Sequence, residues 1–395
     1  MTWEVAKQFC DYLLSTSLCD YSDTPVDGMI VEFIGGEPLL AIDLIDKITD
    51  YLFTTMIELN HPWIYKTRLS ICSNGTLYFQ PKVQEYIKKY NHFLSLGITL
   101  DGNKELHDMC RLFPDGTGSY DKALAATLDA QKKYRQGYGT KLTLAPANVG
   151  YTFAAIKNFI DLGFENIHLN CAYEKGWELE HAKILYDQLI LTADYIIENN
   201  LADKVFVTMF DEHIGKPIDP NNDQNWCGGN GRMVACDWRG DLYPCIRYME
   251  SSLGDSQPPL KIGDIYKGIG HTAQQRELIN DLQSVTRSSQ STEECYYCPI
   301  GDGCAWCSGY NYQATGSYNK RATYICVMHK ARSLANVYYW NMKYLYYNEP
   351  RVYHNWCPEE WAIPIIGEEE WLKLQVIEDM AADGERLITP EEEEN

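Results

Sequence analysis

Short apolar runs alternate with longer amphipathic stretches over the first 210 residues. The short runs are rich in β-branched residues and predict strands, whereas apolar residues that recur every three or four positions predict helices. The stretch PLLAIDLIDKITDYL (38–52) shows this helical spacing most clearly, as expected for a helix packed on a sheet. The predicted strands are 28–34, 68–72, 92–100, 141–145, 165–170 and 204–210. The predicted helices are 3–16, 39–58, 80–90, 119–134, 151–162 and 177–199.

This alternation predicts an α/β fold, with a parallel sheet and crossover helices, either open or closed into a barrel. In such folds ligands bind at the carboxyl ends of the strands. The loop after the first predicted strand contains Gly35, Gly36 and Glu37. Two adjacent glycines let a backbone approach a ligand closely, and a carboxylate beside them suits an ammonium group. The same residues are equally compatible with a simple turn.

The amino-acid composition of the chain limits the classes of partner that it can bind. Lys and Arg number 34 against 55 Asp and Glu, which gives a net charge of −21 and argues against nucleic-acid binding. The 395 residues suit two or three domains. No apolar run reaches the length of a membrane span, and the first residues lack a signal-peptide pattern. We therefore expect a cytoplasmic protein that binds neither nucleic acid nor a membrane.

The fourteen cysteines are unevenly distributed, and eight lie between residues 227 and 326. Two C-x2-C pairs stand five residues apart (295–307), and a loop-like segment, IGKPIDPNNDQN (214–225), precedes the cysteine-rich region. Clustered cysteines in a reducing compartment indicate metal binding rather than disulfides. Iron–sulfur clusters and zinc both fit the spacing. Seven of these eight cysteines fit the spacing pattern, whereas two metal centres with four ligands each would need eight. Cys236 is the nearest candidate for the eighth ligand, or equally a small buried apolar residue.

Taken together, the motifs resemble radical S-adenosylmethionine (SAM) enzymes that carry a SPASM auxiliary-cluster domain. The resemblance covers about residues 1–330 and rests on EFIGGEPLL (32–40), CSNGTL (72–77), ITLDGNKELHDMCR (98–111) and the C-x12-G-x4-C, C-x2-C-x5-C-x2-C and final C pattern. It implies a partial (β/α)6 barrel without its first strand (1–215), a SPASM domain (216–335), and a C-terminal helical segment with an acidic tail (336–395). CPIGDGCAWCSGYNY (298–312) and NKRATYICVMHKAR (319–332) also resemble maturases of peptides with repeated C-x-x-x units.

The resemblance also implies roles for individual residues. Gly35, Gly36 and Glu37 would bind the methionine amino group of SAM, and Ser73 and Asn74 would line the same site. Arg111 would bind the methionine carboxylate, for which a guanidinium is well shaped, although it could also be a surface residue of a loop. One auxiliary 4Fe–4S cluster would be held by Cys227, Cys245 and Cys307, with Cys236 as a candidate fourth ligand. The other would be held by Cys295, Cys298, Cys304 and Cys326.

The implied activity is the maturation of a ribosomally made peptide through a 5′-deoxyadenosyl radical, with a precursor peptide and an electron donor as partners. No catalytic acid or base can be named from the sequence. The radical SAM signature C-x3-C-x2-C is missing, so we expect an N-terminally truncated chain that is inactive alone. The alternative is a non-catalytic iron–sulfur or zinc module that binds a peptide or another partner.

Overall fold

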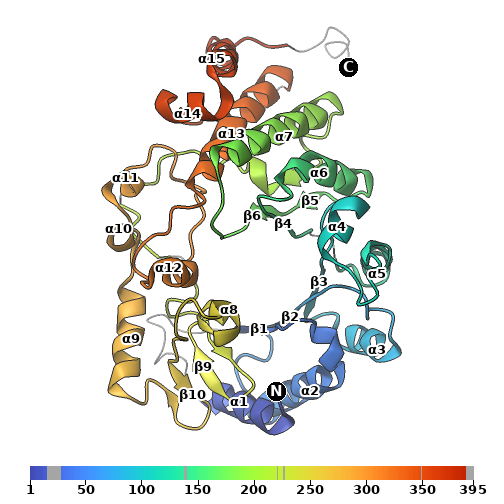
Figure 1. Cartoon of the computed structure of the whole chain (residues 1–395). Coiled ribbons are helices and arrows are strands. Elements are labelled where there is room, and N and C mark those ends of the chain that lie inside the picture. The colour runs from blue at the N-terminus through green and yellow to red at the C-terminus, as the bar shows by residue number, and fades with distance from the viewer. Residues whose placement is uncertain (16–27, 138–139, 220, 226, 348, 388–395) are drawn as a thin grey trace.

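A computed structural model describes the chain except for residues 16–27, 138–139, 220, 226, 348 and 388–395 (Figure 1). After helix α1 (Trp3–Ser15), three parallel strands pair in the order β1-β2-β3. They are β1 (Met29–Phe33), β2 (Thr67–Ser73) and β3 (Leu94–Ile98). The segments that cross between them contain η2 (Pro38–Ala41), α2 (Ile42–Glu58) and α3 (Pro81–Tyr90). The predicted alternation of strand and helix is confirmed here.

The next strands are shorter and form two separate parallel pairs. These are β4 (Leu142–Leu144) with β6 (Leu169–Cys171), and β5 (Asn166–Ile167) with β7 (Phe206–Val207). The helices of this part are α4 (Lys104–Cys110), α5 (Tyr120–Tyr134), η3 (Val149–Tyr151), α6 (Thr152–Asp161), α7 (Leu179–Glu198) and η4 (Thr208–Phe210). The α/β class with parallel strands is confirmed. Within the described residues the strands do not close into a barrel.

The cysteine-rich region is built differently, around an antiparallel sheet of order β11-β10-β9-β8. Its strands are β8 (Ala235–Cys236), β9 (Asp241–Tyr243), β10 (Gly263–Asp264) and β11 (Gly268–Ile269). Its helices are η5 (Ile246–Tyr248), α8 (Glu250–Leu253), α9 (Ala273–Ser284), α10 (Arg287–Gln290), α11 (Glu293–Tyr296) and α12 (Ser308–Thr315). Helix α1 packs on this sheet, and the Tyr12 hydroxyl accepts a hydrogen bond from the Ile269 backbone at 3.0 Å.

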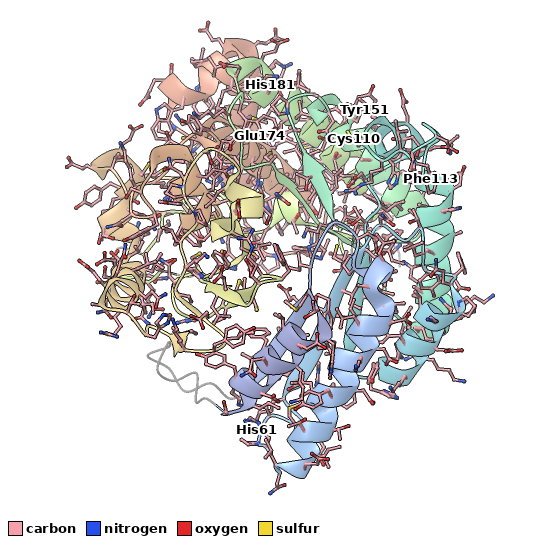
Figure 2. All side chains as sticks on the ribbon, turned by 60° about the horizontal axis from the view of Figure 1, so that its bottom comes forward. His61, Cys110, Phe113, Tyr151, Glu174 and His181 are labelled. Carbon is pink, nitrogen blue, oxygen red and sulfur yellow. The ribbon has the colours of Figure 1, made fainter. Side chains whose placement is uncertain are left out.

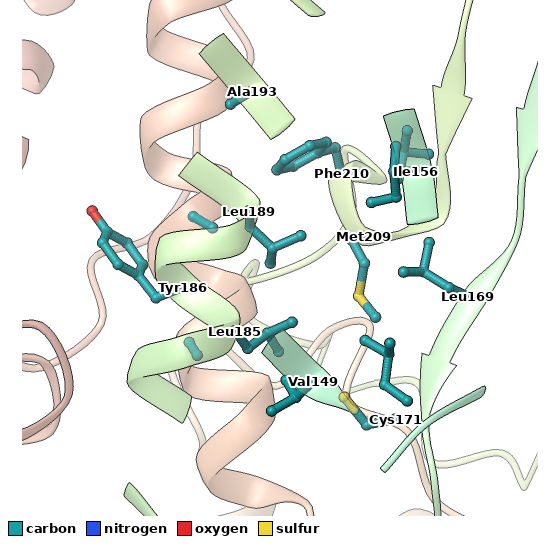
Figure 3. Close-up of a cluster of buried hydrophobic side chains, with 14 of the residues drawn as sticks. Val149, Ile156, Leu169, Cys171, Leu185, Tyr186, Leu189, Ala193, Met209 and Phe210 are labelled. Atoms are coloured by element: carbon teal, nitrogen blue, oxygen red, sulfur yellow. The ribbon is translucent and has the colours of Figure 1, made fainter. Parts of the chain in front are cut away.

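Three helices complete the chain: α13 (Cys326–Tyr346), α14 (Glu359–Ile366) and α15 (Glu368–Ala382). Helix α13 lies along α7, and the two share the largest hydrophobic core with β4 and β6 (Figure 1). Figure 3 shows Leu185 and Leu189 of α7 in this core, facing Met209 and Leu169. The expected domain boundary at residue 335 falls inside α13, so this helix belongs both to the cysteine-rich region and to the main core.

The local sequence of helix α7 explains where this helix begins and which of its faces is buried. It begins with a capping box, in which the Glu178 backbone N–H donates to Nδ1 of His181, and the Glu178 side chain caps a backbone N–H in return (Figure 2 marks His181). The hydrophobic residues that follow at helical spacing are buried against α13.

Among the helices that the structure describes, none has the length and apolar character needed to cross a membrane.

Candidate functional site

Glu37 joins the loop after β1 to the loop after β2. Its Oε1 accepts hydrogen bonds from the Leu39 backbone N–H (3.1 Å) and from the Ser73 hydroxyl (2.8 Å). Its Oε2 accepts from the Asn74 backbone N–H (2.8 Å). These three donors use three of the roughly four acceptor positions of a carboxylate. The group is therefore fixed at the carboxyl edge of the sheet and can still accept one hydrogen bond.

Ser73 and Asn74 also close their own turn. The Ser73 hydroxyl oxygen accepts a hydrogen bond from the Gly75 backbone N–H at 3.0 Å. The Asn74 side-chain oxygen accepts from the backbone N–H and the hydroxyl of Thr76, at 2.9 and 2.7 Å. Gly75 has a φ of +76°, and a Cβ there would meet the Ile98 side chain at 2.9 Å, so this position requires glycine.

Gly35 and Gly36 have no such requirement. Both are exposed, and neither has a positive φ. A Cβ built on either glycine meets no described atom within 4 Å. Packing within the described part of the chain therefore does not account for the two glycines, and the space above them is open.

Arg111 lies in the loop that follows α4, beyond the carboxyl end of β3 (Figure 2 marks its chain neighbours Cys110 and Phe113). Its Nε donates to Oδ2 of Asp101 in a partly buried ion pair. The guanidinium is thus held in place by a carboxylate, and its side chain remains 37% exposed in the loop. Its terminal nitrogens carry further donors, which could engage a second carboxylate.

His107 forms contacts with both segments that carry this ion pair. The Asp101 backbone N–H donates to His107 Nδ1 (3.1 Å), and His107 Nε2 lies 3.0 Å from the Ser119 hydroxyl. The Ser119 hydroxyl donates to the Arg111 carbonyl oxygen (2.9 Å), so Nε2 carries the ring proton. Full burial lowers the pKa of His107, which keeps the ring neutral. The role of His107 here is to fix the loop that carries Asp101 and Arg111.

The structure brings four of the predicted ligands together around one cavity of about 40 Å³. These are Cys295 of α11, Cys298, Cys304, and Cys326, the first residue of α13. Burial raises the pKa of the Cys298 thiol, and the neighbouring Cys326 and Cys295 raise it further. All four are free cysteines.

A second group contains three of the other predicted ligands. Burial raises the pKa of Cys245 to about 12, with smaller contributions from the nearby Cys227 and Cys307. Cys307 is the N-cap of α12, and its sulfur accepts a hydrogen bond from the Tyr310 backbone N–H at 3.5 Å. These three thiols come from separate segments of the cysteine-rich region.

Cys236 is placed elsewhere. It lies in β8 opposite Leu242, and its side chain packs in the hydrophobic cluster between the antiparallel sheet and α1. Its pKa is raised to about 12 by burial, then by two aspartates and by Cys10, which is the thiol nearby. The described contacts therefore match a small, partly buried residue at a hydrophobic cluster, and they give the group of Cys227, Cys245 and Cys307 no fourth cysteine.

Within the described ranges, no three Cys, His, Asp or Glu side chains are arranged to hold a single metal ion. A single tetrahedral zinc ion draws its thiolates to within about 3.8 Å of one another, given zinc–sulfur bonds of about 2.3 Å. A 4Fe–4S cluster instead binds each thiolate through a different iron, so its ligands surround a cavity. Cys295, Cys298, Cys304 and Cys326 line a common cavity.

Sequence reasoning missed the cations around this cavity. Arg321 and Lys330 line it, and Arg321 Nη2 donates to Cys304 Sγ at 3.2 Å. Close by, Arg332 Nε is buried without a hydrogen-bond partner in the described structure. Burial lowers the pKa of Arg332, and the nearby Cys171 and Cys304 oppose this. The signal was present in NKRATYICVMHKAR (319–332), where basic residues stand on both sides of Cys326.

We compared the chain with known proteins. No family model matches it. It is 29% identical over 179 residues to an uncharacterized protein of Methanocaldococcus jannaschii, an alignment that covers 45% of this chain and 55% of that protein. The chain thus spans about half the length of this curated relative.

Solved structures match over most of the chain. The protein anSMEcpe with bound AdoMet and the Kp18Cys peptide superposes with a TM-score of 0.58 at 19% identity, covering 86% of this chain and 89% of that one. The same protein with bound AdoMet alone gives a TM-score of 0.59 at 19% identity, with coverages of 85% and 87%. The chain therefore shares the overall fold of anSMEcpe.

Proposed function

We propose that this chain belongs to a radical SAM enzyme of the SPASM type that modifies a ribosomally made peptide. The observation that carries the proposal is the convergence of Cys295, Cys298, Cys304 and Cys326 on one cavity, in a chain with this fold. Thiols far apart from one another could not bind a shared metal centre, and the similarity of fold alone would not indicate an activity. Four thiols around one cavity are the donor set that a 4Fe–4S cluster needs.

The loops after β1, β2 and β3 supply the SAM site in this proposal. The fixed carboxylate of Glu37 would accept a hydrogen bond from the methionine ammonium, and the open space over Gly35 and Gly36 would admit the ligand against the backbone. Arg111, oriented by Asp101, would bind the methionine carboxylate. Bound SAM would supply, on reductive cleavage, the 5′-deoxyadenosyl radical needed to abstract a hydrogen atom from the substrate.

The two thiol groups would hold auxiliary clusters, which supply single-electron transfer when they are bound. One would be held by Cys295, Cys298, Cys304 and Cys326. The other would be held by Cys227, Cys245 and Cys307, with its fourth position open to another ligand. Arg332 lies near Cys304 with its Nε buried and without a hydrogen-bond partner among the described residues, which supports a negatively charged group in this region.

A peptide is the proposed substrate. The fold neighbour anSMEcpe was solved with peptides Kp18Cys and Cp18Cys, and the motifs at 298–312 and 319–332 resemble peptide maturases. Hydrogen abstraction from a peptide residue, followed by loss of one electron to an auxiliary cluster and release of one proton, would give an oxidised or cross-linked residue. An external electron donor is needed for the first step. We place this reaction in the cytoplasm.

A second function follows from the spacing of the cysteines. No three cysteines of these 395 residues have the C-x3-C-x2-C spacing that binds the SAM-cleaving cluster. In this second function, the protein is a non-catalytic module. It binds auxiliary iron–sulfur clusters or zinc, together with a peptide or another partner. Both functions predict metal at the thiol groups, and they differ in whether SAM is cleaved.

Metal analysis of protein purified without oxygen tests the proposal. We expect iron and sulfide at about four to eight atoms per chain, with a broad absorption near about 400 nm. The variant Cys298→Ser should lose about four irons. The matched control Cys110→Ser, at an exposed cysteine outside both groups, should keep them. One or two zinc ions per chain without that absorption would contradict the iron–sulfur assignment.

A further inference from the structure

Positively charged side chains lie at the cavity formed by Cys295, Cys298, Cys304 and Cys326. Arg321 donates a hydrogen bond to Cys304 Sγ at 3.2 Å, and Lys330 lines the same cavity. Arg332 lies near Cys304, with its Nε buried and unpartnered among the described residues. One carboxylate, Glu294, also lines the cavity. Two cations, Arg321 and Lys330, therefore line the cavity with one carboxylate and four thiols, and a third cation, Arg332, lies near Cys304.

The backbone adds to this field. Cys326 is the first residue of α13, a helix of 21 residues, so the positive end of its dipole lies at the cavity. Lys330 follows one turn later on the same helix, with its Nζ 3.8 Å from the Trp361 ring centroid. This cation–π contact holds the ammonium beside the cavity wall, which Trp361 also lines.

The other thiol group has a different hydrogen-bond environment. The donor to Cys307 Sγ is the neutral Tyr310 backbone N–H, at 3.5 Å. In the first group the donor to Cys304 Sγ is a guanidinium, at 3.2 Å. A charged donor stabilises an anionic acceptor more than a neutral donor does, because it adds the attraction between two full charges. The two groups would therefore stabilise added negative charge unequally.

A cluster with four thiolate ligands is anionic and becomes more negative when it is reduced. Cations and hydrogen-bond donors close to its sulfurs stabilise the reduced form more than the oxidised form, which raises the reduction potential. The effect is large where water is excluded, because the local dielectric constant is low. The buried Arg332 guanidinium would contribute because it lies near Cys304, and its Nε has no hydrogen-bond partner among the described residues.

We propose that Arg321, Lys330 and Arg332 form a cationic ring that raises the reduction potential of the cluster held by Cys295, Cys298, Cys304 and Cys326. This cluster is then the more readily reduced of the two auxiliary clusters. The inference rests on the proposed function, because it needs both thiol groups to hold iron–sulfur clusters. It assigns positioning and tuning roles to three residues that are not ligands.

Redox titration of the full chain, reconstituted without oxygen and followed by electron paramagnetic resonance, tests the inference. Arg321→Met and Lys330→Met each remove one cation from the ring. Each should shift the midpoint potential of one cluster to a lower value and leave the other cluster unchanged. Arg321→Lys keeps the charge without the planar fork and should give a smaller shift. Lys320→Met is the matched control, because Lys320 is an exposed cation next to Arg321 that does not line the cavity.

The outcomes separate the two claims. Absence of iron from the wild-type chain defeats the proposed function itself. If iron content matches the wild type and both ring variants titrate like Lys320→Met, the cationic ring has no effect and the inference is overturned, while the iron–sulfur assignment stands. Should Arg321→Met fail to fold or to load iron, Lys330→Met decides, since the Lys330 ammonium lies over the Trp361 ring and donates no hydrogen bond to a ligand sulfur in the described structure.

Discussion

The carboxylate of Glu37 accepts a hydrogen bond of 2.8 Å from the hydroxyl of Ser73, 36 residues further along the chain. The bond joins the loops after two adjacent parallel strands, β1 and β2. A side chain that is fixed in this way loses little conformational entropy when it binds a ligand, because it is already ordered. The first predictions test this preorganisation.

Glu37→Gln should weaken the binding of SAM by at least about tenfold, which is about 1.4 kcal/mol, because a neutral amide replaces the carboxylate that faces the ammonium. Isothermal titration calorimetry with SAM measures the loss. Glu32→Gln, at an exposed position of β1, is the control and should bind as the wild type does. Equal affinities of the two variants would remove Glu37 from the SAM site.

Asp101→Asn should also weaken SAM binding, although Asp101 acts through Arg111. The substitution keeps the shape of the side chain but removes the charge that orients the guanidinium. We expect a smaller loss than for Arg111→Met, and a double variant no worse than Arg111→Met alone. Additive losses in the double variant would show that the two residues act independently.

Cys236→Ala should keep the full iron content of the wild type. The structure packs this thiol in the cluster beside Leu242 and α1, away from the described contacts of Cys245. The expected cost is a loss of about 1 kcal/mol in the free energy of unfolding, from the deleted buried atom. Iron measurement after reconstitution checks this, with Cys245→Ala as the variant expected to lose a cluster. Loss of iron from Cys236→Ala would make Cys236 the fourth ligand.

Stability should fall as the pH drops below about 6.5, in part because of His354. Burial lowers its pKa from 6.5 to about 4, so the unfolded chain binds a proton that the folded chain does not between these values. Its contribution to the free energy of unfolding is complete above pH 6.5 and is lost as pH falls toward 4, by roughly 2–3 kcal/mol. Urea unfolding at pH 7 and pH 5 should show a smaller difference for His354→Gln than for the wild type. The exposed His213→Gln should leave the difference unchanged.

The 395-residue chain should yield no 5′-deoxyadenosine from SAM in the presence of a strong reductant. No three of its cysteines have the signature spacing, so its sequence supplies no ligand set of that kind for the SAM-cleaving cluster. Chromatography of the reaction mixture provides the test, with an intact radical SAM enzyme as the positive control. Formation of 5′-deoxyadenosine above background would show that other residues can bind that cluster.

Much of the fold of the first half was readable in the sequence. The predicted strand 68–72 is β2 (Thr67–Ser73), and the predicted helix 177–199 is α7 (Leu179–Glu198). Periodicity of apolar residues is a local property, so it survives without knowledge of the fold. The predicted strand 165–170 instead divides into β5 and β6, which pair with different partners, and 204–210 divides into β7 and η4. Such breaks depend on which distant strand lies alongside.

Residue spacing along the chain identified the thiols but not their full surroundings. C-x2-C turns bring Cys295 and Cys298 together by local geometry, and this much the sequence determined alone. Tertiary structure decided that Cys236 packs beside α1 and that Arg321 reaches Cys304. It also paired Asp101 with Arg111 across a helix. These contacts join residues through folded segments between them, and charge and burial at a site depend on what the whole chain places there.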